Sequence, residues 1–227
     1  MKAITFSYDD GVTQDQRLIS ILNKYGLKCT FNLNSGFLGR EGALIREDVT
    51  VAHVKPRPQE IKAIYSGHEI AGHTLTHPSL PGMAEEEIIR QVEEDRLALS
   101  ELAGYEVVGF AYPGGGVNFD GRVADIIRNN TGVKYCRTIE ANYSFDRQSD
   151  LFTFKPTVCH HHNIPRLFEL AEKFFALPDN ADAVFYIWGH AYEFDIDNSW
   201  DAFEDFCRKI SGRDDVFYGT NAEVLLS

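Results

Sequence analysis

Short β-branched and aromatic stretches alternate with amphipathic patterns from one end of this chain to the other. Such alternation favours a mostly parallel sheet covered by helices. We expect strands at 2–8, 28–34, 68–72, 106–112, 132–138, 151–158, 183–189 and 216–220, and helices at 13–25, 59–65, 84–102, 120–129, 165–177, 199–211 and 222–226, with a loop carrying short elements at 36–58. Seven or eight strands of this kind predict an α/β fold, a distorted (β/α)7–8 barrel, closed or nearly closed, forming a single domain over residues 1–227.

The composition is ordinary for a globular protein, and its charge restricts the partners. A formal net charge of −12 argues against nucleic acid or an anionic membrane surface and fits an uncharged or cationic ligand. No stretch approaches the roughly 20 apolar residues that span a bilayer. Met1 leads directly into the first expected strand, and the four cysteines are scattered, so we expect a cytoplasmic protein with reduced thiols. The sequence carries no signal for an oligomeric state.

The first strand runs into two adjacent carboxylates, Asp9 and Asp10, followed by Gly11. Neighbouring side chains of a regular strand point to opposite faces, so the two carboxylates can share one pocket only if the strand ends there and Gly11 permits a sharp turn. Two carboxylates at the end of a buried strand need a cation or hydrogen bonds. An isolated Asp-Asp-Gly is otherwise typical of a solvated turn.

Other polar residues follow the remaining strands, and chemistry in such a barrel lies at the carboxyl ends of its strands. His73 and His77 come after the third strand, Tyr112-Pro113-Gly114 after the fourth, Arg137 ends the fifth, and His190 ends the seventh. Gly72 and Pro78 make a helix across the two histidines improbable, so a curled segment would have to present both imidazoles. With Asp10, they make the ligand set of a catalytic divalent metal such as zinc.

Four motifs together resemble those of a known family. Ser-Tyr-Asp-Asp-Gly, His-Thr-x-x-His, Phe-Ala-Tyr-Pro-Gly-Gly and Trp-Gly-His occur here in the order and spacing found in polysaccharide deacetylases, the NodB-homology group or carbohydrate esterase family 4. The resemblance runs from Thr5 to about His190. The last motif, Gly189 to Phe194, is similar to the Gly-His-x-Tyr-Glu-Phe ending of a bacterial branch of that family.

The resemblance implies hydrolysis of an N-acetyl group from a sugar by a metal-dependent enzyme. It implies one divalent ion, zinc first and Co²⁺, Mn²⁺ or Ni²⁺ as alternatives. The matched positions are Asp9 as general base, His190 as general acid, Asp10, His73 and His77 as metal ligands, Thr74 as a brace of the metal loop and the Gly114 amide as oxyanion donor. These roles agree with the chemistry that a metal, a base and an acid supply.

Two positions depart from the family pattern. Ala111 stands where the family has an arginine that orients the base, and we expect Arg137 to reach Asp9 from the next strand instead. The Asp-rich fourth motif is only loosely echoed by Asp146 and Asp150, and Leu151 stands where an aromatic residue is usual.

The remaining candidates lie around the expected pocket. We expect Tyr112, Tyr192, Glu193 and His161 to contact substrate or line the pocket, while three consecutive histidines at 160–162 cannot all converge on a second metal from a regular strand. Trp188, His53 and His68 are expected to be core, structural or exposed residues.

The alternatives to a carbohydrate deacetylase are a metal-dependent amidase for a non-sugar amide and a catalytically silent sugar-binding barrel. The intact set of base, acid and ligands argues against the silent barrel. The acetylated carbohydrate could be a small sugar, an oligosaccharide or a polymer.

Overall fold

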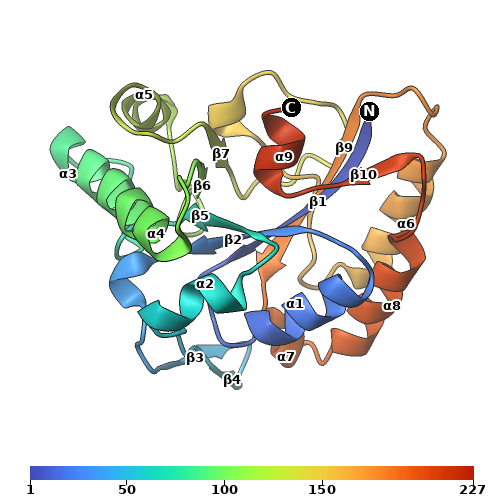
Figure 1. Cartoon of the computed structure of the whole chain (residues 1–227), viewed down its shortest axis with the longest axis horizontal. Coiled ribbons are helices and arrows are strands. Elements are labelled where there is room, and N and C mark those ends of the chain that lie inside the picture. Colours follow the sequence, from blue (N-terminus) through green and yellow to red (C-terminus); the bar gives the residue numbers. More distant parts are fainter.

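β1 (Lys2–Asp9) forms the centre of a curled parallel sheet in the computed structural model, which describes all 227 residues (Figure 1). It pairs along its whole length with β9 (Ala183–His190), and on its other side with β10 (Val216–Tyr218) and then β2 (Cys29–Leu33). The sheet order is β7-β6-β5-β2-β1-β9-β8, where β5 is Glu69–Gly72, β6 Gly109–Ala111, β7 Tyr135–Arg137 and β8 Val158–Cys159. An isolated parallel bridge pairs Arg137, the last residue of β7, with Phe154, which lies in the segment before β8. The predicted α/β fold is therefore confirmed, as a curled parallel sheet that forms a half-barrel.

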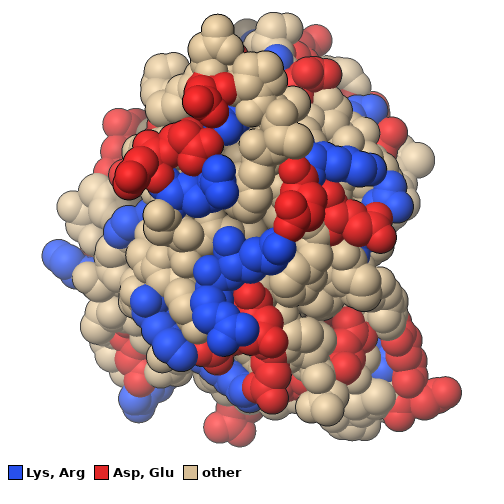
Figure 2. Space-filling view, turned by 90° about the vertical axis from the view of Figure 1, so that its right-hand side faces the viewer, with Lys and Arg blue, Asp and Glu red and all other residues tan.

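Helices surround this sheet (Figure 1). They are α1 (Asp15–Lys24), α2 (Ile61–Ile64), α3 (Glu85–Ile89), α4 (Asp95–Ala103), α5 (Gly121–Asn130), α6 (Ile164–Phe175), α7 (Glu193–Ile196), α8 (Trp200–Ile210) and α9 (Asn221–Leu225). None of them combines the length and the apolarity that crossing a bilayer requires. On the face above α6 and α8, acidic and basic side chains are interspersed (Figure 2).

Alternate residues of β1 serve two different environments. Phe6 and Tyr8 belong to the main apolar core, which packs against the helices. Thr5 and Ser7 instead bond to polar partners across the sheet interior, to Asn221 at 2.8 Å and Asn32 at 2.8 Å. The period of two that separates these faces brings Asp9 to the inner face at the carboxyl end of the strand.

The structure refines one local prediction and corrects two others. The short elements expected within residues 36–58 are the two strands of a β-hairpin, β3 (Ala43–Arg46) and β4 (Val49–Ala52). The expected strand at 151–158 begins as a 3₁₀ turn, because the Asp150 carboxylate accepts the Phe152 N–H at 3.0 Å and leaves only a two-residue strand. The predicted helix 84–102 is interrupted by a π-helical segment, Arg90–Glu94, between α3 and α4.

Candidate active site

A cavity of about 540 Å³ opens at the carboxyl ends of the central strands. Its lining includes most of the polar residues that follow the strands in the sequence, namely Asp9, Asp10, His73, His77, Tyr112, Gly114, His190 and Glu193. Phe37, Leu44, Ile139 and Trp188 add apolar wall. The parallel order of the sheet therefore brings together residues that lie far apart in the chain.

A sharp turn at Asp10 lets both carboxylates reach this cavity. Asp10 has a φ of 78° and Gly11 a φ of 56°, so the strand ends between Asp9 and Asp10. A positive φ is unusual for a residue with a side chain and is held only where the surroundings determine it. A Cβ on Gly11 would also meet the Leu33 side chain at 2.4 Å. Glycine at position 11 thus permits the positive φ of the turn and avoids a clash with the Leu33 side chain.

Asp9 is buried against a cation and an amide. Arg137, which is fully buried, donates to both Asp9 oxygens and lies 2.6 Å from Oδ1, and the Asn32 side chain donates to the same oxygen at 2.8 Å. The guanidinium carbon also lies 4.4 Å from the centre of the Trp188 ring, which holds it by a cation–π contact. Ala111 is on the adjacent strand, so the guanidinium reaches Asp9 from β7 rather than from β6.

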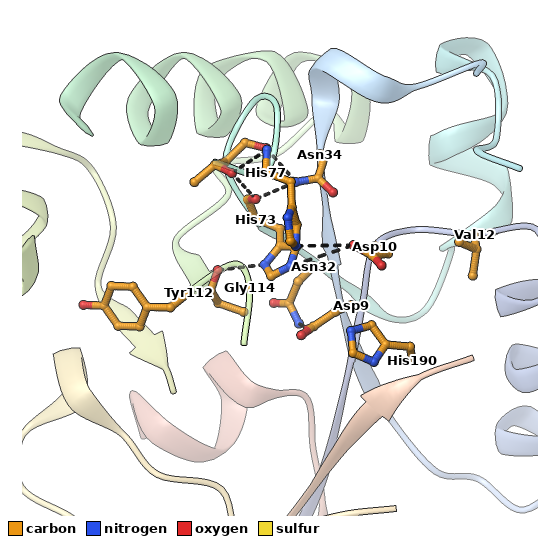
Figure 3. A network of polar contacts seen from close by, with 12 residues as sticks. Asp9, Asp10, Val12, Asn32, Asn34, His73, His77, Tyr112, Gly114 and His190 are labelled. Carbon is orange, nitrogen blue, oxygen red and sulfur yellow. Dashed lines mark hydrogen bonds and ion pairs between the residues drawn. The ribbon is translucent and has the colours of Figure 1, made fainter. Parts of the chain in front are cut away.

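Asp10, His73 and His77 face a common space (Figure 3). The Nε2 atoms of the two histidines lie 4.0 and 3.9 Å from Asp10 Oδ1. His73 Nδ1 lies 2.8 Å from the Ala111 carbonyl, so its proton belongs there and the Nε2 lone pair points toward Asp10. Burial lowers the pKa of His73 to about 4, which keeps the ring neutral, as a ligand must be. This donor set fits a divalent cation.

The loop that carries the two histidines is held by polar contacts. Thr74 and His77 have φ values of 69° and 55°, and the Thr74 hydroxyl accepts the His77 N–H at 3.0 Å. The buried Asp95 carboxylate accepts the His73 N–H at 3.0 Å, and burial raises the pKa of Asp95 to about 7. From the π-helical segment, the Gln91 carbonyl accepts the Leu75 N–H at 2.9 Å. The curled shape that the two imidazoles need is therefore built by their neighbours.

His53, which the sequence predicts to be a structural or exposed residue, belongs to the site together with Lys55. His53 Nε2 lies 3.2 Å from Asp10 Oδ2, and the Lys55 ammonium donates to the Asp10 carbonyl. Both residues follow β4 and line the cavity. The only local signal was the alternation of Val49 and Val51 just before them, which indicated a strand in a stretch with little other pattern.

His190, the last residue of β9, lies beside Asp9, on the side of the site away from His73 and His77 (Figure 3). Glu193 holds its ring in place. Glu193 Oε1 lies 2.9 Å from His190 Nδ1, and Oε2 accepts the His190 N–H at 2.8 Å. Burial alone would lower the pKa of His190, but the Glu193 carboxylate outweighs it and raises the pKa to about 9. Glu193 is therefore a partner of His190 rather than an open rim residue, and its i, i+3 spacing was the available signal.

The other predicted pocket residues take different positions. Tyr192 is fully buried, stacks on His190 with ring centres 5.0 Å apart and does not line the cavity. The Tyr112 ring points away from the cluster, and its hydroxyl donates to the Phe152 carbonyl at 2.9 Å (Figure 3). His161 lies outside the cavity. Gly114 lines the cavity, and its N–H makes no hydrogen bond within the chain.

The model of one family, polysaccharide deacetylase, matches residues 1–135, which is more than half of the chain. The chain belongs to the polysaccharide deacetylase family. Over 49 residues this family member is 43% identical to chitooligosaccharide deacetylase from Sinorhizobium fredii, a match that covers 21% of this chain and 23% of that relative.

Solved structures share the fold of this polysaccharide deacetylase family member. One is a mutant of a carbohydrate esterase family 4 pseudoenzyme with restored enzymatic activity, at 18% identity and a TM-score of 0.61, covering 99% of this chain and 68% of that one. Another is a family 4 acetyl xylan esterase from Clostridium thermocellum in complex with a cobalt ion, at 15% identity and a TM-score of 0.61, covering 99% and 91%. At these identities the likeness shows the fold alone.

Proposed function

We propose that this chain hydrolyses the N-acetyl group of an acetylated carbohydrate and uses one divalent cation. The observation that carries the proposal is the convergence of two carboxylates and three imidazoles, Asp9, Asp10, His73, His77 and His190, on one cavity. Binding of a sugar alone would need neither a buried base nor a charged histidine. The likeness to chitooligosaccharide deacetylase supports the same class of substrate.

Asp10, His73 and His77 would hold the cation through one carboxylate oxygen and two Nε2 atoms. Two imidazoles and one carboxylate favour zinc, and cobalt, manganese and nickel accept the same donors. When bound, the cation polarises the acetyl carbonyl and lowers the pKa of the attacking water. The Asp10 backbone carbonyl and Oδ2 are already engaged by Lys55 and His53, which leaves Oδ1 toward the histidines.

Asp9 accepts the proton of the attacking water in this proposal. Its two oxygens are oriented by Arg137, whose guanidinium pairs with this buried carboxylate. The free N–H of Gly114 donates to the developing oxyanion. His190, charged because of Glu193, then donates a proton to the departing amine. The residue that accepts a proton and the residue that donates one thus both line the cavity.

The choice of substrate can be tested directly by acetate release. Purified protein supplied with zinc is expected to release acetate from N-acetylglucosamine oligomers at least tenfold faster than from simple acyl amides such as N-acetylated amino acids. The cavity of about 540 Å³ lies in the usual range for small ligands and offers both apolar wall and polar groups. Preference for the non-sugar amides would instead favour the amidase, and zinc-bound protein without any turnover would favour the silent barrel.

The alkaline limit of the pH profile is expected to depend on Glu193. Since His190 must be protonated to act as an acid, kcat should fall as the pH rises through about 9, the pKa of His190. Glu193→Gln removes the carboxylate that raises this pKa, so the fall should occur at lower pH. The measurement is kcat against pH for the wild type, Glu193→Gln and Glu172→Gln, whose carboxylate is exposed. An alkaline limb that stays in place in Glu193→Gln would contradict the assignment.

A further inference from the structure

A second group of metal-ligating side chains lies outside the cavity. Glu47, His161, His162 and Asp197 each offer one ligand atom, and these atoms all lie within 4.8 Å of one another. They come from three separate segments, the turn of the β3–β4 hairpin, the loop between β8 and α6, and the end of α7. Asp197 and His161 are mostly buried, whereas Glu47 and His162 are about half exposed, so an ion could enter from solvent.

Asp197 holds both imidazoles by the same ring position. Its Oδ2 lies 3.1 Å from His161 Nδ1, its Oδ1 lies 3.2 Å from His162 Nδ1, and Oδ2 also accepts the His162 N–H at 3.2 Å. The two rings stack with their centres 3.8 Å apart. A carboxylate that accepts from Nδ1 fixes the tautomer of a histidine and presents its Nε2 lone pair on the other side.

Both Nε2 atoms then meet a second carboxylate. Glu47 Oε1 lies 2.8 Å from His162 Nε2 and 3.3 Å from His161 Nε2. His162 Nε2 lies within hydrogen-bond distance of Glu47 Oε1, as His161 Nδ1 does of Asp197 Oδ2. Glu47 Oε1 and the two Nε2 atoms converge on one point. A divalent cation placed among them would be bound by all three atoms at once.

We propose that Glu47, His161 Nε2 and His162 Nε2 bind a second divalent cation of the zinc class, with Asp197 as the residue that orients the two histidines. Zinc binds nitrogen and oxygen ligands at about 2.0–2.2 Å, which puts its ligands about 3–3.5 Å apart. The contacts of Glu47 with the two rings fall in or near that range. This site is separate from Asp10, His73 and His77, and it does not depend on the proposed deacetylation.

The cation would fasten the β3–β4 hairpin to the rim of the cavity. Glu47 occupies the turn of this hairpin, while Leu44 and Arg46 before the turn and His53 and Lys55 after it line the cavity. The other two ligands belong to the loop that precedes α6. Binding of the cation therefore couples the turn of the hairpin to the fixed part of the barrel, and the position of one wall of the cavity depends on it.

Zinc stoichiometry separates the two sites. Zn²⁺ is titrated by calorimetry into chelator-treated wild type, His77→Ala, His162→Ala and the double variant, with thermal unfolding as the check on folding. We expect the wild type to bind two equivalents of zinc, each single variant to bind one, and the double variant to bind none. Glu47→Gln in the His77→Ala background should weaken the remaining site at least tenfold, and Asp197→Asn should weaken it about 10- to 100-fold. The matched control is Glu41→Gln, an exposed carboxylate before the same hairpin. A His77→Ala protein that binds no zinc, or a double variant that still binds it, would overturn the proposal.

Hydrogen exchange tests the fastening of the hairpin. In the His77→Ala background, Zn²⁺ should slow amide exchange over residues 43–52, and in the double variant it should not. Zinc that binds without changing exchange over this segment would show that the fastening is wrong.

Discussion

Asp9→Asn is expected to reduce kcat for acetate release by about 10²- to 10⁴-fold, the usual contribution of a general base. The amide of asparagine can accept hydrogen bonds but cannot take a proton from water. Asp9 is not among the three predicted ligands, so the variant should keep its cation. The measurements are kcat, KM and metal content on the same preparation.

Asp201→Asn is the matched control for this variant, because the Asp201 side chain is fully exposed. Asp9→Asn also leaves the buried Arg137 without its anion, so thermal unfolding must show that the protein is folded at the assay temperature. Activity within threefold of the wild type in a folded, metal-loaded Asp9→Asn protein would remove Asp9 from the role of base.

Arg137→Met is expected to lower both stability and kcat. The guanidinium is fully buried and pairs with a carboxylate that is itself 2% exposed, and removing one partner of such a pair typically costs about 3–5 kcal/mol of folding free energy. If Arg137 had only a structural role, the variant would lose stability while its folded fraction kept the kcat of the wild type. If Arg137 positions Asp9, the folded fraction should also show a lower kcat with little change in KM.

Arg137→Lys separates the two effects. Lysine keeps the charge but lacks the second terminal nitrogen, which donates to the Thr138 carbonyl, and the planar group that lies over Trp188, so stability should recover more than kcat. Arg208→Met, at an exposed arginine, controls for loss of a positive charge. Wild-type kcat in folded Arg137→Met would contradict the positioning role.

The fold and much of the cavity lining could be predicted because the chemistry follows the strands. Each strand is a short run that local pattern reveals, and a parallel sheet brings all carboxyl ends to one edge whatever the details of the helices. Asp9, Asp10, His73, His77 and His190 therefore could be grouped without knowing any contact. The contact between Arg137 and Asp9 could be expected for the same reason, since β7 and β6 are neighbours.

The site residues that the sequence does not reveal depend on long-range contacts. His53 and Lys55 follow a hairpin whose strands are mostly exposed and carry only a weak apolar alternation, and only the fold brings its end to Asp10. The turn of Asp10 and the π-helical segment beside Leu75 are imposed by tertiary contacts that override local preference.

Strand geometry predicts that the three histidines at 160–162 cannot converge, whereas the structure has the chain leave β8 and turn there. The chain leaves β8 at Cys159, and His162 has a φ of 55°, so consecutive side chains no longer alternate. His160 turns inward to stack on Phe194 with ring centres 4.1 Å apart, while His161 and His162 turn together toward Glu47. A local departure from strand geometry thus decides which of them can act together.

The central claim is that Asp10, His73 and His77 hold the cation on which deacetylation depends, and loss of His77 tests it most directly. Metal content is measured for wild type and His77→Ala, followed by acetate release from N-acetylglucosamine oligomers before and after zinc is added. The account predicts that His77→Ala loses one equivalent of metal and its zinc-dependent acetate release, while the wild type keeps both. A His77→Ala protein that keeps the metal content and the acetate release of the wild type would contradict it.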